Sequence, residues 1–524
     1  MIKLLLLLVV AYLLYYFLVK PYRFWKERGI KYVKPLPIFG NIFENIIQRK
    51  SLAEIFKSFY DEFRDQRYCG MYQFMKPVLV VNDIELMKTI TIKDFDYFTD
   101  HVNHSREEVD RLWSRNLFAM IGEPWRDMRG TLSPAFTGSK MRFMFSLMNE
   151  CAENFAAYYL KENKELIQLE MRDTYTRVTN DVIASCAFGI TCDSLKDKEN
   201  VFYVKARKAF DFSGIRQTIF ILFNTLPRLM KFLGLKIITD EMGIFFRGVI
   251  DESIRIREEK CISRPDMINL LLESRKGKMS EDGKNVVDSF ASTEEYSLGM
   301  KTKNIEMTNE DITAQALIFF LGGFDTTSYV MCFLTHELAL NNEIQEKLRE
   351  EINSTWKNCQ GKLTYEALIG MTYLDMLISE VLRKWPPFPF LDRICTRDYT
   401  IKATRPEEKD YHLKKNDIIV FPMFGIHRDP EFYPNPEVFD PERFSIKNRA
   451  KIVPSSYIPF GIGPRNCIGS RFALLENKAT IFHLIRNFQV VPTEKTSIPM
   501  VVSKKQFNIS SQHGFWVGLK RLPA

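Results

Sequence analysis

The chain has 524 residues, and its 73 Lys and Arg against 65 Asp and Glu give a formal net charge of +8. The basic residues are spread among acidic ones and form no long run in the body of the chain, so we expect no nucleic-acid partner. Its 9 cysteines are odd in number and lack CxxC spacing, which argues against a disulfide framework or a structural zinc site.

Residues 1–20 are expected to form an N-terminal membrane anchor. No charged residue occurs from Leu4 to Val19, and as a helix this run would cover about 24 Å, with the flanking lysines extending it. A cleaved signal peptide is the alternative, but no small-residue cleavage site follows the apolar run. The basic residues that begin at Lys20 predict that the rest of the chain lies in the cytosol.

Residues 21–40 indicate a basic, proline-rich hinge, because Pro35 and Pro37 cannot both lie inside a helix. The body, residues 41–524, carries amphipathic helical patterns from about residue 50 to 270 and from 308 to 384, with few strand-like runs. We therefore expect a mainly α protein. The polar stretch from about 276 to 307 is typical of a long surface connection.

A long helix is predicted to begin at Thr308, which can cap it with Asp311 three positions later. Residues 314–334 are almost entirely apolar, so a second membrane span is an alternative. Asp325 near the middle would cost about 2.5 to 3.5 kcal/mol in a membrane. A buried core helix is therefore the better prediction.

Within this helix, Gly322 and Gly323 each cost about 1 kcal/mol relative to alanine but create space. Asp325 and Thr326 follow directly, and a carboxylic acid beside a hydroxyl could relay a proton in a dry pocket. The alternative is a glycine packed against a crossing helix beside a solvated Asp325. The pattern alone leaves both interpretations open.

Two further pairs have helical spacing. Glu380 and Arg383 end a predicted helix, and such an i,i+3 pair is common on helix surfaces. Trp125 and Arg129 lie one turn apart, where an indole N–H and a guanidinium could together grip a carboxylate. Without other evidence, a tryptophan that anchors a surface helix is the better interpretation of the second pair.

The stretch FGIGPRNCIG, residues 460–469, holds Cys467 just ahead of a predicted helix, where the N-terminal dipole favours a thiolate. A dinucleotide-binding loop is excluded, because Asn466 stands where the third glycine is needed. A cysteine nucleophile would need a base, but no recognisable motif surrounds His427 or His483. A thiolate that ligates one metal through one bond suits haem.

The cysteine stretch resembles the haem-binding loop F-x-x-G-x-R-x-C-x-G of the cytochrome P-450 family, in which the matching residues are Phe460, Gly463, Arg465, Cys467 and Gly469. Four further motifs occur in the family's order: WxxxR, GGFDTT, ExxR and PERF. With the anchor and hinge, the chain is similar to microsomal members, and LSPAFTGSKMR and FLDRICTRDYT are most similar to the insect group that oxidises foreign compounds.

The resemblance implies a mainly α fold with small β-sheets, the cytochrome P-450 fold, preceded by an N-terminal transmembrane helix. It implies haem b with Cys467 as the axial thiolate and O2 as co-substrate. Asp325 and Thr326 would deliver protons to dioxygen, with Gly322 and Gly323 leaving room for it. The residues that would hold the haem propionates are Trp125, Arg129, Arg393 and Arg465. Glu380, Arg383 and Arg443 would form a buried structural triad.

The same resemblance implies a monooxygenase of the endoplasmic reticulum membrane that acts on hydrophobic small molecules. Electrons would come from NADPH-cytochrome P-450 reductase, with cytochrome b5 as a second donor. Alternatives are an endogenous lipid or hormone hydroxylase, a haem-thiolate isomerase, and a membrane-tethered carrier of hydrophobic ligands.

The family also suggests which parts of the chain line the substrate pocket and which face the membrane. Ile318, Leu321, the loop before Trp125 and the turn at 388–390 would line the pocket, and the aromatic stretch 210–234 would lie at the membrane. The sequons at Asn103, Asn353 and Asn508 would remain unglycosylated in the cytosol.

Overall fold

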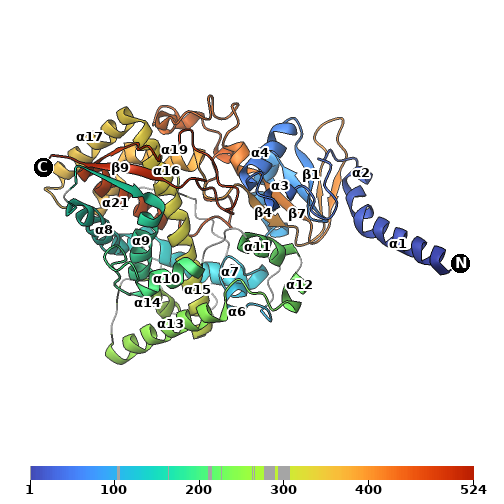
Figure 1. Ribbon diagram of the computed structural model, residues 1–524, viewed down its shortest axis with the longest axis horizontal. Helices are drawn as coiled ribbons and strands as arrows, with labels where there is room; N and C mark the ends of the chain where they lie inside the picture. The colour runs from blue at the N-terminus through green and yellow to red at the C-terminus, as the bar shows by residue number, and fades with distance from the viewer. Residues whose placement is uncertain are drawn as a thin grey trace.

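The computed structural model of the protein describes residues 2–523 except 103–106, 163, 210–214, 226, 262, 263, 265, 276–289 and 293–306. A large helical body carries a sheet-rich part at one side, and the N-terminal helix projects away from that side (Figure 1). The first helices are α1 (Ile2–Leu18), α2 (Phe24–Glu27), α3 (Phe43–Ile46), α4 (Leu52–Glu62), α5 (Ile84–Lys88), α6 (Arg111–Ser114), α7 (Gly122–Leu132), α8 (Gly138–Leu160), α9 (Met171–Ile183) and α10 (Val201–Ala209).

The remaining described α-helices belong to the helical body or lead to its last sheet. They are α11 (Ile215–Thr225), α12 (Pro227–Phe232), α13 (Asp240–Lys260), α14 (Met267–Arg275), α15 (Asn309–Leu321), α16 (Thr327–Leu340), α17 (Asn342–Asn358), α18 (Tyr365–Ile369), α19 (Thr372–Lys384), α20 (Met423–Ile426) and α21 (Ser470–Asn487).

Shorter turns of helix connect these elements. The π-helical turns are η2 (Thr89–Lys93), η5 (Ala184–Phe188) and η6 (Gly322–Thr326). The 3-10 turns are η1 (Lys20–Arg23), η3 (Phe95–Tyr97), η4 (Ser133–Phe136), η7 (Pro441–Phe444), η8 (Arg449–Lys451) and η9 (Pro454–Ser456).

The described strands form three small sheets, in the orders β1-β2-β7-β4, β3-β9-β8 and β5-β6. The fold is thus mainly helical with small sheets, as predicted. The strands are β1 (Tyr68–Gln73), β2 (Lys76–Val81), β3 (Leu166–Glu170), β4 (Leu391–Ile394), β5 (Tyr399–Ile401), β6 (Tyr411–Leu413), β7 (Ile418–Phe421), β8 (Phe488–Val491) and β9 (Trp516–Arg521).

The largest sheet is buried on both faces. Val78 and Val80 of β2 contribute to one hydrophobic cluster, while Leu79 and Val81 contribute to the other, as the alternation of a strand requires. Strand β4 pairs antiparallel with β7, and this register places Arg393 opposite Ile419. The sheet therefore fixes the backbone of one predicted site residue.

The segment predicted as a hinge is docked onto this sheet. Trp25 is 2% exposed, and its indole nitrogen donates to the Met71 carbonyl at 2.9 Å. A Cβ on Gly70 would lie 2.4 Å from the Trp25 ring, so the strand accepts the indole only because residue 70 is a glycine. The chain is thus anchored to the body soon after α1 ends.

The long apolar helix predicted from Thr308 runs through the helical body as α15, η6 and α16 (Figure 1). Thr308 and Asp311 form the predicted capping box. Within the described residues, Asn309–Leu340 is the one helix long and apolar enough to cross a membrane, but 78% of its apolar window is buried inside the protein. The prediction of a core helix is confirmed, and the alternative of a second membrane span is wrong.

The α1 helix has the opposite character. Leu4 to Leu8 are exposed, with Leu4 at 65% and Leu7 at 68%. The predicted connection at 276–307 lies outside the described residues, except for 290–292 and 307.

All nine cysteines are free thiols.

Candidate functional site

The cysteine loop reaches Cys467 through a tight turn. The Cys467 N–H donates to the Phe460 carbonyl at 2.8 Å. Gly463 has a φ of +77°, and a Cβ there would lie 2.0 Å from the Thr91 carbonyl oxygen. Only glycine fits this position, both for its conformation and for the close approach of η2. The first residue of α21, Ser470, follows three positions after the cysteine.

The Cys467 thiol is exposed, yet so much protein surrounds it that burial raises its pKa. The Gly469 N–H and the Arg129 guanidinium act in the other direction, because both favour the thiolate. An accessible sulfur just ahead of a helix N-terminus, with an N–H donor and a nearby cation, suits a thiolate ligand to a metal.

The predicted WxxxR pair, Trp125 and Arg129, contacts this loop. Arg129, on α7, donates to the Asn466 carbonyl at 2.9 Å and to the Asn466 side-chain oxygen at 2.8 Å. Trp125 is 1% exposed, and the Arg465 guanidinium lies over its ring at 4.1 Å. The tryptophan is therefore not a surface anchor, and the pair belongs to the wall around Cys467.

Arg465 and Arg393 are both almost fully buried. Arg465 donates to the carbonyls of Thr99, Leu117 and Met120. Arg393 donates to the Asp392 carbonyl at 2.7 Å and the Ile462 carbonyl at 3.3 Å. Its Nε has no hydrogen-bond partner within the described part of the chain. Burial lowers the pKa of Arg393 to about 10.

These arginines form a cationic cluster with Arg129. Burial is the main reason that the pKa of Arg465 is lowered, and the nearby Arg393 and Arg129 charges lower it further. The carboxylates that face the cluster are Asp100, 3.8 Å from Arg465, and Asp392. Three guanidiniums near two carboxylates, with one buried N–H unpartnered, fit the anionic propionate edge of a haem.

His101 belongs to the same cluster, although the sequence did not indicate it. Its Nδ1 lies 3.2 Å from an Asp392 carboxylate oxygen. Burial lowers the pKa of His101 despite this carboxylate. Burial opposes ionisation of Asp392 as well, but His101 and the Val102 N–H hold its pKa below the usual range.

One face of the long helix is open where the rest is buried. Ile318, Leu321, Gly322 and Thr326 are exposed or half-buried, while most of their neighbours are buried. Positions three and four apart lie on one face of a helix. A Cβ on Gly322 would meet nothing within 4 Å among the described residues. This face is apolar except for the Thr326 hydroxyl.

Gly323 does not share this role, contrary to the expectation that both glycines leave room for dioxygen. It is buried, and a Cβ there would lie 2.8 Å from Ile183 Cδ1 on the crossing helix α9. The alternative of a glycine packed against a crossing helix is therefore correct for Gly323, while Gly322 faces open space. The two adjacent glycines serve different purposes.

Asp325 points away from solvent into a polar network. It is 8% exposed, and one carboxylate oxygen pairs with the Arg172 guanidinium from α9. The other accepts a hydrogen bond from the Asn508 side-chain amide at 2.7 Å. The Arg172 guanidinium also lies over the Tyr329 ring at 3.7 Å. The sequence indicated neither Arg172 nor Asn508 as a partner of this acid.

Thr326 is the last residue of the π-helical turn η6, a feature that is frequent at functional sites, and Thr327 is the first residue of α16. Thr326 Oγ1 donates to the Gly322 carbonyl at 2.5 Å, and Thr327 donates to the Gly323 carbonyl. The Thr326 lone pairs remain available on the open face. A half-buried hydroxyl therefore lies beside the buried acid Asp325.

The ExxR pair is fully buried, so the surface-pair interpretation is wrong and the structural triad is supported. The Glu380 and Arg383 side chains are both 0% exposed and lie 2.7 Å apart. Arg443 Nε lies 3.5 Å from Glu380, and the Asp440 N–H donates to the same carboxylate at 3.0 Å. This network ties η7 to α19.

His427 connects this triad with the cysteine loop. Its Nδ1 lies 3.2 Å from the Arg383 carbonyl, and the Ile458 N–H donates to its Nε2 at 3.0 Å. This pattern assigns the Nδ1–H tautomer. Burial and the Arg383 charge lower the pKa of His427 to about 3. The imidazole is thus neutral and structural.

Glu476, on α21, is a second carboxyl that the sequence did not indicate. It is 1% exposed, and neither of its oxygens has a hydrogen-bond partner within the described residues. Burial raises its pKa well above the usual range, although the nearby Thr327 hydroxyl acts weakly in the other direction. Burial therefore favours the neutral form of Glu476.

The predicted pocket regions meet in a chain of aromatic rings. Phe507 contacts Phe388 and Phe390 of the predicted turn, with ring centroids 6.2 and 6.1 Å apart, and Phe220 of α11 at 5.4 Å. Phe220 contacts Trp113, which contacts Phe118 in the loop before Trp125. Phe507, from the C-terminal segment, joins regions that the sequence could only name separately.

This architecture and the cysteine loop fit the class of haem-thiolate proteins. The family described as Cytochrome P450 matches residues 31–516. Similar proteins include Cytochrome P450 9e2 of Blattella germanica, 42% identical over 513 residues (95% of this chain and 93% of that one). Probable cytochrome P450 9f2 of Drosophila melanogaster is 41% identical over 510 residues, with 95% and 94% of the two chains covered.

A third relative is Cytochrome P450 6k1 of Blattella germanica, 36% identical over 509 residues, which are 97% of this chain and 94% of that one. The chain belongs to the cytochrome P-450 family and is a monooxygenase of that family. Membership implies a haem held by a cysteine thiolate and the use of O2.

Proposed function

We propose that this protein is a membrane-anchored monooxygenase that inserts one oxygen atom from O2 into hydrophobic foreign compounds, such as plant toxins or insecticides. The group implied at the site is haem b, which Cys467 would hold through its thiolate and which would supply the chemistry that activates O2. Trp125, Arg129, Arg393 and Arg465 would hold its propionates.

The observation that carries the proposal is the open face of α15 and η6. Ile318 and Leu321 give it an apolar surface, and the Thr326 hydroxyl is its polar group. The aromatic chain from Phe118 to Phe507 extends the apolar lining. Such a lining selects substrates by hydrophobicity more than by specific hydrogen bonds, which favours a range of foreign compounds over one endogenous hormone.

The buried acid supports oxygen chemistry over isomerisation. An isomerase that rearranges hydroperoxides needs no supply of protons, whereas reduction of one oxygen atom to water does. Asp325 lies next to Thr326 on η6, and Arg172 and Asn508 hold its carboxylate. We propose that Asp325 passes protons to the Thr326 hydroxyl, which passes them into the pocket.

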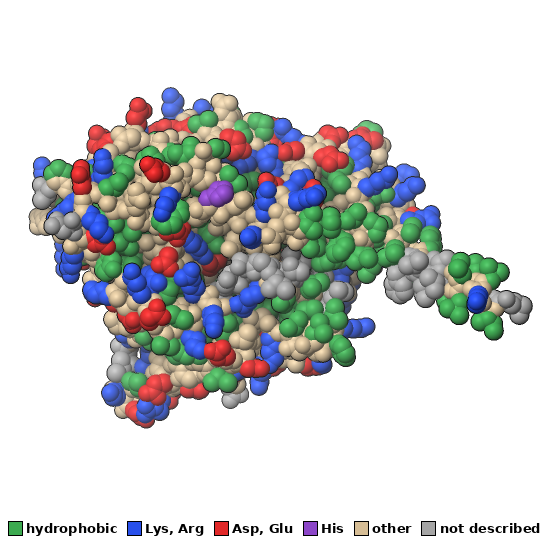
Figure 2. Space-filling model, in the orientation of Figure 1, with side chains coloured by type: hydrophobic (Ala, Val, Ile, Leu, Met, Phe, Trp, Pro, Cys, Tyr) green, Lys and Arg blue, Asp and Glu red, His purple; other side chains and the backbone are tan. Residues whose placement is uncertain are grey.

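Exposed hydrophobic side chains support the proposal that the protein is attached to a membrane. We propose residues 1–20 as a single-pass anchor in the endoplasmic reticulum, 21–40 as the hinge and 41–524 as the cytosolic catalytic domain. Hydrophobic side chains gather on the side of the body nearest to α1 (Figure 2). Exposed hydrophobic side chains of the described residues include Leu36 at 44%, Ile38 at 49%, Phe232 at 85% and Leu233 at 52%. Exposed patches of this kind mark interaction or membrane surfaces.

Two of the three sequons lie among the described residues. The Asn508 side-chain nitrogen, where a glycan would be attached, is half-buried and donates to Asp325, so a glycan there would break the network around the acid. Asn353 is exposed on α17, and a glycan there would contradict the proposed topology. Asn103 lies outside the described residues.

Electrons would be supplied by NADPH-cytochrome P-450 reductase, with cytochrome b5 as a second donor. The experiment combines the purified protein with reductase, NADPH and hydrophobic substrates. Oxygenated product that depends on all three components supports the proposal. Absence of turnover with retained ligand binding would favour the carrier alternative.

Thr326→Ala tests the proton route in the same assay. Without the hydroxyl, NADPH consumption should continue while product falls and peroxide release rises. Thr326→Ser is the matched control, since it keeps the hydroxyl and should retain coupling close to wild type. Unchanged coupling in Thr326→Ala would remove Thr326 from the mechanism.

A further inference from the structure

A hollow of about 400 Å³ opens at the surface among α9, α10 and the start of α11. Most of the charged side chains that line this hollow are basic. Five of the eight lining side chains are basic, and Glu199 is the acidic one. The basic ones are Arg177, Lys198, Arg207, Lys208 and Arg216.

The floor of this basic pocket is a fixed guanidinium. The Arg177 side chain is 10% exposed; its Nε donates to Asp173 at 2.9 Å and its Nη1 to the Ser194 carbonyl at 2.8 Å. It also lies 4.3 Å from the centre of the Tyr203 ring. Within the described residues, Arg177 Nη2 donates to no partner. Because the group is held from several sides, those N–H groups are preorganised to receive an acceptor.

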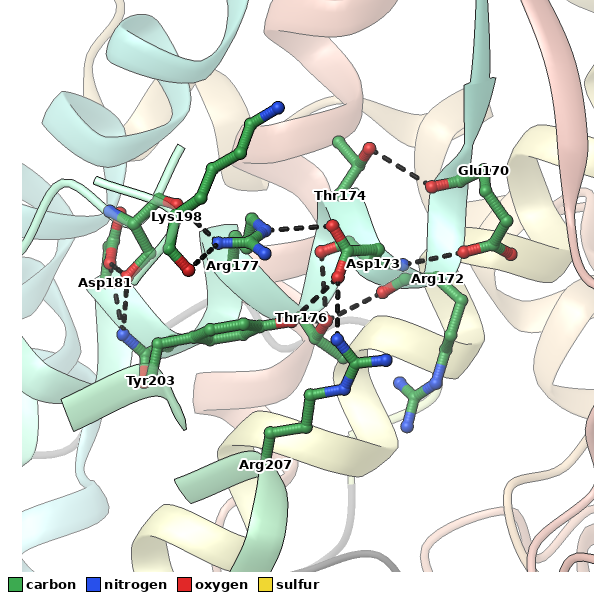
Figure 3. Close-up of polar contacts among 12 residues, drawn as sticks. Glu170, Arg172, Asp173, Thr174, Thr176, Arg177, Asp181, Lys198, Tyr203 and Arg207 are labelled. Carbon is green, nitrogen blue, oxygen red and sulfur yellow. Dashed lines mark hydrogen bonds and ion pairs between the residues drawn. The ribbon is translucent and has the colours of Figure 1, made fainter. Parts of the chain in front are cut away.

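Asp173 neutralises only part of this charge. Figure 3 shows the Arg177 and Arg207 guanidiniums reaching this one carboxylate from different sides. The Tyr203 hydroxyl donates to it as well, at 3.1 Å. Among the described residues, Asp173 and Glu199 are thus the carboxylates near the five basic side chains that line the pocket.

The lysines at the rim add unpaired charge. Lys198 and Lys208 are exposed, and neither forms an ion pair with any residue that the structure describes. The neighbouring Glu241 pairs with Lys205 instead, although the Lys208 charge helps to lower the pKa of Glu241. These two lysines thus add positive charge that no ion pair within the described residues compensates.

We propose that this pocket binds a small anion that carries two or more phosphate groups. An arginine fork and flexible ammonium groups are the donors that suit phosphate oxygens, and the volume lies within the usual range of small-molecule sites. Its polar lining distinguishes the ligand from the hydrophobic substrates of the oxygenase site. A bound ligand would link α9 to α10 and α11.

The same phosphate chemistry could come from a soluble metabolite or from a lipid headgroup. Titration calorimetry on the full-length holoenzyme, at fixed ionic strength, uses sodium pyrophosphate as the soluble probe and sodium sulfate as the screening control. Vesicle flotation compares phosphatidylcholine vesicles that contain a phosphatidylinositol bisphosphate with vesicles of equal charge that contain phosphatidylserine.

The test variant is Lys198→Glu with Lys208→Glu, and the matched control is Lys409→Glu with Lys447→Glu, which changes net charge equally at exposed sites away from the pocket. We expect saturable pyrophosphate binding that weakens about tenfold or more in the test variant only. A preference for the bisphosphate vesicles, lost in the same variant, would assign the lipid source.

Two results would overturn the proposal. One is the absence of saturable binding to pyrophosphate together with no preference for the bisphosphate vesicles. The other is equal weakening in the test and control variants, which would show that net charge alone attracts the anion.

Discussion

Arg172 of α9 and Asp325 of η6 form a largely buried ion pair beside the open face of the long helix. Asn508 holds the second oxygen of the same carboxylate. Both oxygens of Asp325 are thus engaged, so the acid must release one partner before it can pass a proton to Thr326. The ion pair sets the resting position of the acid.

Asp325→Asn should lower product formation by about 10²-fold or more, because an amide cannot carry the proton. Arg172→Gln is the matched variant, since it breaks the same ion pair but leaves the acid in place, and it should stay within about tenfold of wild type. Rates of product formation, with the solvent isotope effect, measure both. Equal losses in the two variants would mean that the pair is only structural.

Gly463→Ala should abolish haem binding. The added Cβ would lie 2.0 Å from the Thr91 carbonyl, at a φ that side chains rarely adopt. Gly322→Ala is the control, because its Cβ meets nothing within 4 Å in the described residues, and it should fold and keep haem. Haem content per mole of protein provides the readout. Full haem content in Gly463→Ala would contradict the geometry of the loop.

Replacing each of the buried acids Glu476 and Glu380 by glutamine should affect stability to very different extents. Glu476→Gln should change the free energy of unfolding by less than about 1 kcal/mol, since glutamine resembles the neutral acid that burial favours. Glu380→Gln should cost about 3 to 5 kcal/mol, because it leaves Arg383 buried without its anion. Thermal unfolding measures both. A large loss in Glu476→Gln would show that Glu476 is ionised and paired.

His427 should make stability depend on pH. Its pKa is about 3 in the fold and near 6.5 in the unfolded chain, so only the unfolded chain takes up this proton between those values. Stability should therefore fall as pH drops from 6.5, by up to about 1.4 kcal/mol per pH unit from this residue. His427→Gln should show a shallower slope than wild type in unfolding experiments from pH 7 to 5. An unchanged slope would contradict a buried neutral imidazole.

The features that could be predicted from the sequence depend on residues that lie close together in the chain. The cysteine loop, the cap at Thr308 and the burial of the long helix depend on neighbouring residues, and the structure agrees with them. The long-range partners could not be predicted, because Arg172, Asn508 and Phe507 lie far from Asp325 or from the pocket motifs in sequence. The separate roles of Gly322 and Gly323 likewise depend on which helix crosses them.

His427 and Glu476 were missed for a related reason. A single histidine or glutamate has no local signature that distinguishes a buried structural group from a surface one. The role of His427 follows from its burial and from its contacts with the Arg383 carbonyl and the Ile458 N–H. That of Glu476 follows from its burial beside Thr327 of α16, and only the folded chain brings these groups together.

We propose Cys467 as the thiolate that would hold a haem. The most direct test is the absorption spectrum of the dithionite-reduced protein with and without carbon monoxide, for wild type and Cys467→Ala. We predict a red-shifted, thiolate-type Soret band in wild type that disappears in the variant. The same band in Cys467→Ala, or no haem in well-folded wild type, would contradict the assignment of Cys467 as the haem ligand.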